Sequence, residues 1–365
     1  MKEDYLILKS IKLPFCFSDF KEEDFSLICW DIFLKKVYKE GVAGLIFYNL
    51  KDTRFKLFLP KKVFKALEDY YLTNLGRNLL IHQQLQEIFK AFGEERVFCF
   101  LIRGGFFSKY LYHDLGIRPM ADIDLAIFKK DLSRVKKILE ELGYQPSRRY
   151  PFFFFKESFY IDLHLDRPGF WRVDSWPSKI EITREDVFKR SHALENFPNV
   201  RVFEIYDMIL SCCQHIQQHS FSRLIWFVDI VWLMKGVDNF CWDSFLERAE
   251  EFNLLKTTYF VIKYLEENKL ISLSRDILIK MENRIKLNFL ERRNLKYLLS
   301  YRRDKVCGEL LFLFSLRSWL HRLKLLKEVI FLKKEFFPLA DRDPNVFSYF
   351  TRSLRIGRYL LKKLI

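Results

Sequence analysis

Glycine and proline are scarce in this sequence, which has 12 glycines and 10 prolines among its 365 residues. β-Sandwiches and other loop-rich folds need these residues for their many turns, so the scarcity argues against such folds. Half of the residues are apolar and 17% are aromatic, including 39 phenylalanines. Such a composition excludes general disorder and favours long helices that pack through aromatic side chains.

The sequence also has no run of 18 uncharged apolar residues. The first residues, MKEDYLILKS, do not contain the apolar core of a signal peptide. We therefore expect a cytoplasmic protein without a transmembrane segment. Its seven cysteines include no CxxC pair, and we expect them to be buried, reduced thiols.

Positive charge exceeds negative charge, with 62 Lys and Arg against 47 Asp and Glu and a formal net charge of +15. This excess suits an acidic partner such as a nucleoside triphosphate, RNA or an anionic membrane surface. A general bias towards lysine, with no partner implied, explains it equally well. The basic C-terminus carries Arg352, Arg355, Arg358, Lys362 and Lys363 among apolar residues. It is expected to be a solvated helix against the core, with contact to RNA or anionic lipid as the alternative.

Hydrophobic periodicity divides the chain into three expected regions. Residues 1–95 are predicted to be a helical support region, because apolar residues recur at helical spacing in 25–33 and 62–91. Residues 96–200 alternate between strands and helices and are expected to form a domain built around a small sheet. Residues 201–365 are predicted to be a helical C-terminal domain. The overall prediction is an α+β fold with a small mixed sheet flanked by helices.

Within the middle region the pattern predicts individual elements. Strands are expected at 97–102, 122–128, 144–155 and 158–165, and helices at 105–113 and 131–142, the second capped by Asp131 and closed near Gly143. Residues 200–204 fit either a short strand or an extended lead-in to the next helix. Such a sheet is too small for a six-stranded Rossmann unit. Helices are then expected at 206–218, 222–234, 242–252 and 257–267.

Two aspartates occupy alternate positions of the 122–128 strand. Because side chains alternate along a strand, Asp122 and Asp124 share one face, while Ile123 and its apolar neighbours point to the core. Carboxylates a few Å apart repel each other, and a hard divalent cation keeps such a pair ionised at low cost. The pattern therefore predicts a metal site.

A third carboxylate is expected from the 158–165 strand, where Asp162 and His164 share a face. If this strand lies beside the one that bears Asp122 and Asp124, three carboxylates meet, as in two-metal sites. Asp166 competes with Asp162 for this role. His164 either forms a hydrogen bond near the metals or only packs.

The glycine pair Gly104 and Gly105 lies where a strand is expected to meet a helix, a place where backbone N–H groups can cradle phosphate. Arg103 and Arg118 flank this region, and a guanidinium can bind a triphosphate through two hydrogen bonds. For Arg118 the alternative is an ion pair with Asp114.

Other candidate residues are better explained by packing. His215 and His219 have a zinc-capable i, i+4 spacing, but no third ligand accompanies them, so a packed or hydrogen-bonded role is expected. Asp229 lies in an apolar helical stretch and is predicted to be a buried structural acid. The aromatic run 152–155 is predicted to be sheet core, with base stacking as the alternative.

Taken in order, these motifs resemble a known family. The motifs are Arg-Gly-Gly before a helix, RPMADIDL at 118–125, IDLH at 161–164 and CCQHIQQHSFSRLIWFVDIVWLM at 212–234. They resemble the uncharacterised nucleotidyltransferases of the DNA polymerase β-like superfamily, over roughly residues 98–234. The resemblance implies that residues 96–200 are a nucleotidyltransferase domain with a polymerase β-like palm. It also implies two Mg²⁺ ions (or Mn²⁺) and transfer of a nucleotidyl group from a triphosphate such as ATP.

The resemblance also implies roles for single residues. Asp122 and Asp124 would bind metals, and Asp162 would be the third ligand and would orient or deprotonate the acceptor hydroxyl. The superfamily often has Gly-Ser where this sequence has Gly104-Gly105, so one hydroxyl contact to phosphate is lost, and Ser108 is a weak substitute.

The function expected from this resemblance is Mg²⁺-dependent transfer to an unidentified acceptor, a small molecule or a protein hydroxyl. Two alternatives stay open: a non-catalytic nucleotide-binding or regulatory protein that keeps the fold, and an RNA-acting nucleotidyltransferase.

Overall fold

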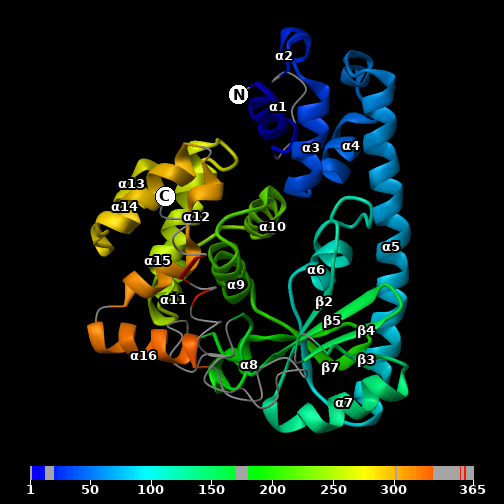
Figure 1. The fold of residues 1–365 in the computed structure, drawn as a ribbon, viewed down its shortest axis with the longest axis vertical. Coiled ribbons are helices and arrows are strands. Elements are labelled where there is room, and N and C mark those ends of the chain that lie inside the picture. Colours follow the sequence, from blue (N-terminus) through cyan, green and yellow to red (C-terminus); the bar gives the residue numbers. More distant parts are fainter. Residues whose placement is uncertain are drawn as a thin grey trace.

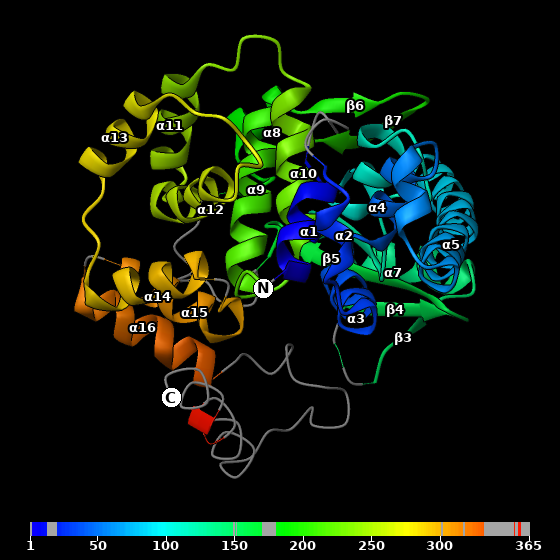
Figure 2. The ribbon, with the colours of Figure 1, turned by 90° about the horizontal axis from the view of Figure 1, so that it is seen from above.

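The computed structural model describes residues 2–12, 20–148, 150, 152–169, 180–300, 302–316 and 318–331, together with the single positions 354, 357 and 358. It shows an α+β protein in which helices flank a mixed sheet, as predicted (Figure 1). Seen from above, the sheet and the long helix α5 lie on one side, α9 and α10 in the centre, and α11 to α16 on the other side (Figure 2).

The N-terminal region is helical, as expected. Its elements are α1 (Lys2–Ser10), α2 (Glu23–Ser26), α3 (Trp30–Glu40), α4 (Ala43–Leu50), a 3₁₀ turn (Arg54–Phe58) and α5 (Lys61–Glu94). The 25–33 stretch is not one helix, because the chain is extended at Cys29 (φ −78°, ψ 98°). There the backbone N–H donates to Glu3 Oε1 over 3.1 Å instead of continuing a helix.

The sheet is larger than predicted. Seven strands are present in the described residues, in the order β3-β4-β5-β2-β1-β7-β6. Their bounds are β1 (Cys99–Leu101), β2 (Ile123–Ile127), β3 (Gln145–Pro146), β4 (Phe153–Lys156), β5 (Phe159–Leu165), β6 (His192–Leu194) and β7 (Phe197–Val202). The predicted 144–155 strand is thus two strands, and 197–202 is a strand parallel to β1. The two paired strands β1 and β7 are about 100 residues apart in the sequence. The local alternation of apolar and polar residues therefore does not indicate that they pair.

Alternation in the central strands separates a core face from a polar face. Ile123, Leu125 and Ile127 of β2 are at most 1% exposed, and Ile161 and Leu163 of β5 are fully buried beside them. Helices α5 and α7 (Leu132–Glu141) lie along the sheet (Figure 1). Asp131 precedes α7 but makes no side-chain capping hydrogen bond, contrary to prediction. Gly143, with a φ of +85°, follows the helix as expected.

Between β1 and β2 the chain forms α6 (Gly104–Phe106) and one π-helical turn (Phe107–Leu111), where a regular helix was predicted. The remaining helices are α8 (Glu185–Arg190), α9 (Ile205–Gln218), α10 (Leu224–Lys235), α11 (Trp242–Glu251), α12 (Leu255–Glu267), α13 (Arg275–Arg284), α14 (Phe289–Leu299), α15 (Gly308–Ser315) and α16 (Trp319–Ile330). The four helices predicted from 206 to 267 correspond to α9 to α12.

One continuous apolar core extends from Leu6 to Leu325. No helix among the described residues is long and apolar enough to span a membrane. None of the six cysteines within the described residues forms a disulfide; four are buried, whereas Cys29 and Cys241 are exposed. Cys16 and all of the predicted basic C-terminal helix except positions 354, 357 and 358 lie outside the described residues. The division into three domains stays a prediction.

Candidate active site

The parallel pairing of β2 and β5 creates the candidate site. Asp124 lies directly opposite Asp162 in this ladder, so both side chains project from the polar face of the sheet. His164 lies two residues beyond Asp162 on the same face. Asp124, Asp162 and His164 each offer a ligand atom, and these atoms lie within 4.8 Å of one another. Two of the three predicted carboxylates, Asp124 and Asp162, therefore meet across the two strands, and His164 rather than Asp122 completes the close group.

Asp122 stands just before β2 and is half-buried. Burial together with the negative charges of Asp124 and Asp162 raises its pKa to about 7. The pKa of Asp124 shifts in the opposite direction. Burial raises it, but Arg103 and His164 outweigh burial and lower the pKa to about 2. The cluster thus holds more negative charge than nearby cations balance.

His164 is held by two hydrogen bonds. Its Nδ1 accepts from the backbone N–H of Gly169 over 3.1 Å, and its Nε2 lies 2.9 Å from Asp124 Oδ1. Because Nδ1 is an acceptor, the hydrogen bonds assign the proton of the neutral ring to Nε2, which donates to Asp124. His164 therefore orients a carboxylate, and in this arrangement it has no lone pair to offer a metal.

Arg103 is the cation nearest to Asp124. Its Nη1 donates to Asp124 Oδ1 over 3.0 Å and lies 3.4 Å from His164 Nε2, while its Nε is buried without a partner. The Arg103 backbone has φ 52° and ψ −126°, a conformation that residues with a side chain rarely adopt. Strain of this kind costs of the order of 1–3 kcal/mol and concentrates at functional sites.

The glycine pair begins α6, next to Arg103. A Cβ at Gly104 would come within 2.9 Å of Arg118 Nη1, and one at Gly105 within 2.7 Å of Leu101 Cδ1. An added Cβ at either position would push a neighbouring side chain aside, so close packing already favours glycine there, and the phosphate contact of the two glycines stays a prediction. Ser108 is fully buried, and its hydroxyl is 2.9 Å from His82 Nε2. The idea that Ser108 replaces the missing serine of the superfamily is therefore wrong, because its hydroxyl faces the interior.

Arg118 pairs with Asp229 of α10, and not with Asp114. Nε and Nη2 of Arg118 contact the two carboxylate oxygens of Asp229 at 3.3 and 2.8 Å, and Nη1 donates to the carbonyl of Pro119. Burial lowers the pKa of Arg118, but the negative charge of Asp229 outweighs burial. The pKa of Arg118 is therefore raised. Asp114 accepts instead from the Tyr71 hydroxyl at 2.7 Å.

The prediction that Asp229 is a buried structural acid is confirmed. Its partner lies 111 residues away. The only sequence signal for the pair was a single acid within an apolar helix.

His215 and His219 pack as expected. Their rings lie 4.5 Å apart and contact the ring of Trp226. Burial, together with the positive charge of Arg103, lowers the pKa of His215 well below its usual value and that of His219 to about 4. Because Arg103, the cation nearest to Asp124, acts on both rings, the C-terminal half of α9 faces the acid cluster.

Asp166 does not join the cluster. It follows the last residue of β5 with a φ of +58°, and its Oδ1 accepts from the backbone N–H of Lys129 over 2.9 Å. The carboxylate thereby anchors the chain just after β2. Of the two competing acids, only Asp162 faces Asp124.

An aromatic pair lies beside the acids on the polar face. Phe154 is buried as predicted, but Phe153 lies opposite Asp162 in the β4–β5 ladder. The Phe153 ring stacks on Tyr160 with a centroid distance of 5.5 Å, and Tyr160 is 39% exposed. The core prediction therefore holds for Phe152 and Phe154, whereas Phe153 and Phe155 are only partly buried.

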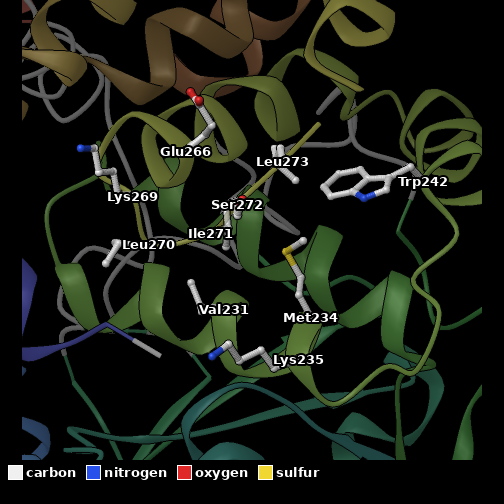
Figure 3. Close-up of a pocket in the computed structure, with 10 residues that line it drawn as sticks. All are labelled: Val231, Met234, Lys235, Trp242, Glu266, Lys269, Leu270, Ile271, Ser272 and Leu273. Carbon is white, nitrogen blue, oxygen red and sulfur yellow. The ribbon is translucent and has the colours of Figure 1, made fainter. Parts of the chain in front are cut away.

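A separate cavity of about 650 Å³ is lined by residues from several C-terminal helices and the loops next to them (Figure 3). It lies between the end of α10 and the segment after α12, and is lined by Val231, Met234, Lys235, Trp242, Glu266, Lys269, Leu270, Ile271, Ser272 and Leu273. None of the residues of the acid cluster lines it. Its lining mixes apolar groups with charges of both signs and indicates no particular ligand.

Carboxylates on adjacent strands, beside an arginine and a glycine turn, are groups that sites which transfer phosphorus-containing groups commonly use. Comparison with protein families agrees. Residues 26–268 match the family described as uncharacterised nucleotidyltransferase, and since this is well over half of the chain, the protein belongs to that family. No curated protein and no solved structure matches the chain.

Proposed function

We propose that the protein transfers a nucleotidyl group from a nucleoside triphosphate, in the presence of Mg²⁺ or Mn²⁺, to an acceptor hydroxyl. The observation that carries the proposal is the opposed pair Asp124 and Asp162 on neighbouring parallel strands, in a chain of a nucleotidyltransferase family. The acceptor is a small molecule or a protein side chain, as expected from the sequence.

The donor set fits hard divalent cations. Asp122, Asp124 and Asp162 supply only oxygen ligands, which Mg²⁺ and Mn²⁺ prefer. The raised pKa of Asp122 reflects unbalanced negative charge that a cation would neutralise. Bound ions would neutralise charge on the phosphates and lower the pKa of the attacking hydroxyl. His164 keeps the Asp124 carboxylate in a fixed orientation.

The remaining roles follow from position on the sheet. Arg103 and the Gly104–Gly105 turn lie on the β1 side of the acids and would face the leaving pyrophosphate. Attack at phosphorus is roughly in line with the leaving group, so the acceptor would enter from the β5 and β4 side. Asp162 lies on that side and would orient or deprotonate the acceptor hydroxyl, and the ring pair Phe153–Tyr160 would contact the rest of the acceptor.

The alternatives differ in what they require. A non-catalytic nucleotide-binding protein needs no third carboxylate, so the retention of Asp162 opposite Asp124 favours an enzyme. An RNA acceptor is suggested by the net charge of +15, which is equally compatible with triphosphate binding alone.

The proposal is tested by incubating the purified protein with Mg²⁺, cell extract and triphosphates labelled at either the α- or the γ-phosphate. Nucleotidyl transfer moves only the α-label to an acceptor, and the double variant Asp122→Asn, Asp124→Asn should abolish it while the fold remains. Transfer of the γ-label would instead show a kinase. Triphosphate binding without any transfer would support the non-catalytic alternative, and a ribonuclease-sensitive product would identify RNA.

A further inference from the structure

The guanidinium of Arg103 occupies the position that the acid cluster offers to a cation. Its Nη1 contacts Asp124 at 3.0 Å and lies 3.4 Å from His164, so it touches one candidate metal ligand and the histidine that orients this ligand. The side chains of Arg103 and Asp124 are only 7% and 14% exposed. A metal ion and this guanidinium would therefore compete for the same carboxylate.

The contact between Arg103 and Asp124 leaves a hydrogen-bond donor without an acceptor, in contrast to the buried Arg118–Asp229 pair. Arg118 uses all three of its nitrogens in hydrogen bonds, two of them to Asp229. Arg103 meets Asp124 through one nitrogen, and its buried Nε has no acceptor. A buried donor without a partner destabilises the arrangement, and the rare backbone conformation of Arg103 adds to that cost. The Arg103–Asp124 contact is therefore easier to break than the Arg118–Asp229 pair.

We propose that Arg103 is a displaceable counter-ion that blocks the metal site in the free protein and moves to the triphosphate when substrate binds. This inference rests on the proposed function for the identity of the displacing ligand. A phosphate group next to Gly104 and Gly105 can accept hydrogen bonds from both Nε and Nη of the guanidinium, which satisfies the donor that is now unpartnered. Asp124 is thereby released to bind a metal ion. Metal and triphosphate then bind cooperatively, and each alone binds weakly.

The first measurement is Mn²⁺ affinity, by electron paramagnetic resonance and calorimetry, without any nucleotide. Arg103→Met should bind Mn²⁺ at least about tenfold more tightly than the wild type, because a competing charge a few Å from the ligand is removed. The matched control is Lys109→Met, which removes one positive charge from an exposed position on the following π-helical turn and should change the affinity by less than about twofold. Equal Mn²⁺ affinity in the wild type and Arg103→Met would overturn the proposal.

The second measurement adds a non-hydrolysable triphosphate analogue. In the wild type the analogue should tighten Mn²⁺ binding by more than about tenfold, whereas in Arg103→Met this coupling should largely disappear and the analogue should bind weakly. Coupling that persists in Arg103→Met would contradict the transfer of Arg103 to the phosphates. If Arg103→Met does not fold, Arg103→Lys, which keeps the charge on a shorter reach, should show intermediate Mn²⁺ affinity.

The two proposals can fail separately. In one outcome, Arg103→Met binds Mn²⁺ more tightly but the wild type does not bind the analogue. This result would confirm that Arg103 blocks the site. It would also reject the triphosphate as the displacing ligand, and the proposed function with it. Unchanged Mn²⁺ affinity, with normal nucleotidyl transfer by the wild type, would reject only the displacement.

Discussion

At the scale of single residues, two aspartates of the same strand region have opposite protonation behaviour. Asp124 is hydrogen-bonded by Arg103 and His164, which stabilise its charge. Asp122 is partly buried and lies near the negative charges of Asp124 and Asp162. Both effects destabilise its ionised form. Because their environments differ, Asp122 is the group that gains most from a bound cation.

Asp122 should make metal-free stability depend on pH. The pKa of Asp122 is raised from 3.8 to about 7 in the folded protein, so the native state holds the proton more strongly than the unfolded state. The resulting stability is fully present below pH 4 and is lost as the pH rises through 7. Asp122→Asn should therefore raise the free energy of unfolding at pH 8 by roughly 1–3 kcal/mol, with little change at pH 4, measured by denaturation in EDTA.

The exposed Asp238→Asn serves as the control for Asp122→Asn and should leave the pH profile unchanged. A loss of stability at pH 8 in Asp122→Asn would show that its carboxylate is structural.

Asp162 and Asp166 can be separated by parallel substitutions. Asp162→Asn should lower nucleotidyl transfer by roughly 10²–10⁴, the range for a lost general base, while triphosphate affinity falls only modestly. Asp166→Asn keeps an oxygen that can accept from the Lys129 N–H, so both transfer and stability should be nearly unchanged. Transfer kinetics and calorimetric affinity of the two variants provide the comparison, and the opposite ranking would move the site to Asp166.

At the scale of elements, the Arg118–Asp229 pair joins the segment before β2 to helix α10. Tyr112, just after the π-helical turn, donates to the same carboxylate over 2.7 Å. Asp229 is 2% exposed, so its charge depends on these partners. The pair therefore positions the α6 region, with Arg103 and the glycines, against the C-terminal helices.

Asp229→Asn should destabilise the protein by about 3–5 kcal/mol, because Arg118 would remain buried without its counter-charge. Replacing both partners by apolar residues, as in Arg118→Met with Asp229→Leu, should recover much of this loss. Chemical denaturation measures both variants. If Arg118→Met instead keeps its stability and binds triphosphate weakly, the predicted phosphate contact of Arg118 is correct.

At the scale of the whole molecule, the N-terminal helices contact the C-terminal helices as well as the sheet region. Glu40, at the end of α3, accepts from the backbone N–H of Leu224 over 2.9 Å and from Arg303 over 2.6 Å. Asn78 of α5 donates to the carbonyls of Leu115 and Arg118. These contacts connect all three predicted regions, so we expect them to unfold together.

Glu40→Ala should lower the free energy of unfolding by about 3–5 kcal/mol, since it leaves the buried Arg303 and the first N–H of α10 without their acceptor. Glu68→Ala, which removes an exposed i, i+3 partner of Lys65, should cost less than about 1 kcal/mol. Urea denaturation followed by tryptophan fluorescence and by circular dichroism should give one coincident transition. Two separate transitions would show that the predicted regions are independent domains.

The sequence alone determined the features that depend on local periodicity. Alternation in 122–128 separated Asp122 and Asp124 from the buried isoleucines and leucine, and the helical period located α9 to α12 within one or two residues. The motif order also led to the correct family. These features are local because the backbone geometry of a strand or helix sets which side chains share a face.

Only the tertiary structure decided which residues meet across long separations. It added β7 beside β1, paired Arg118 with Asp229, placed Arg103 on Asp124 and fixed the proton of His164 through Gly169. In the sequence each charged residue has many candidate partners. The choice among them depends on strand order and on which charges packing removes from water, because a buried charge is tolerated only where another element supplies its partner.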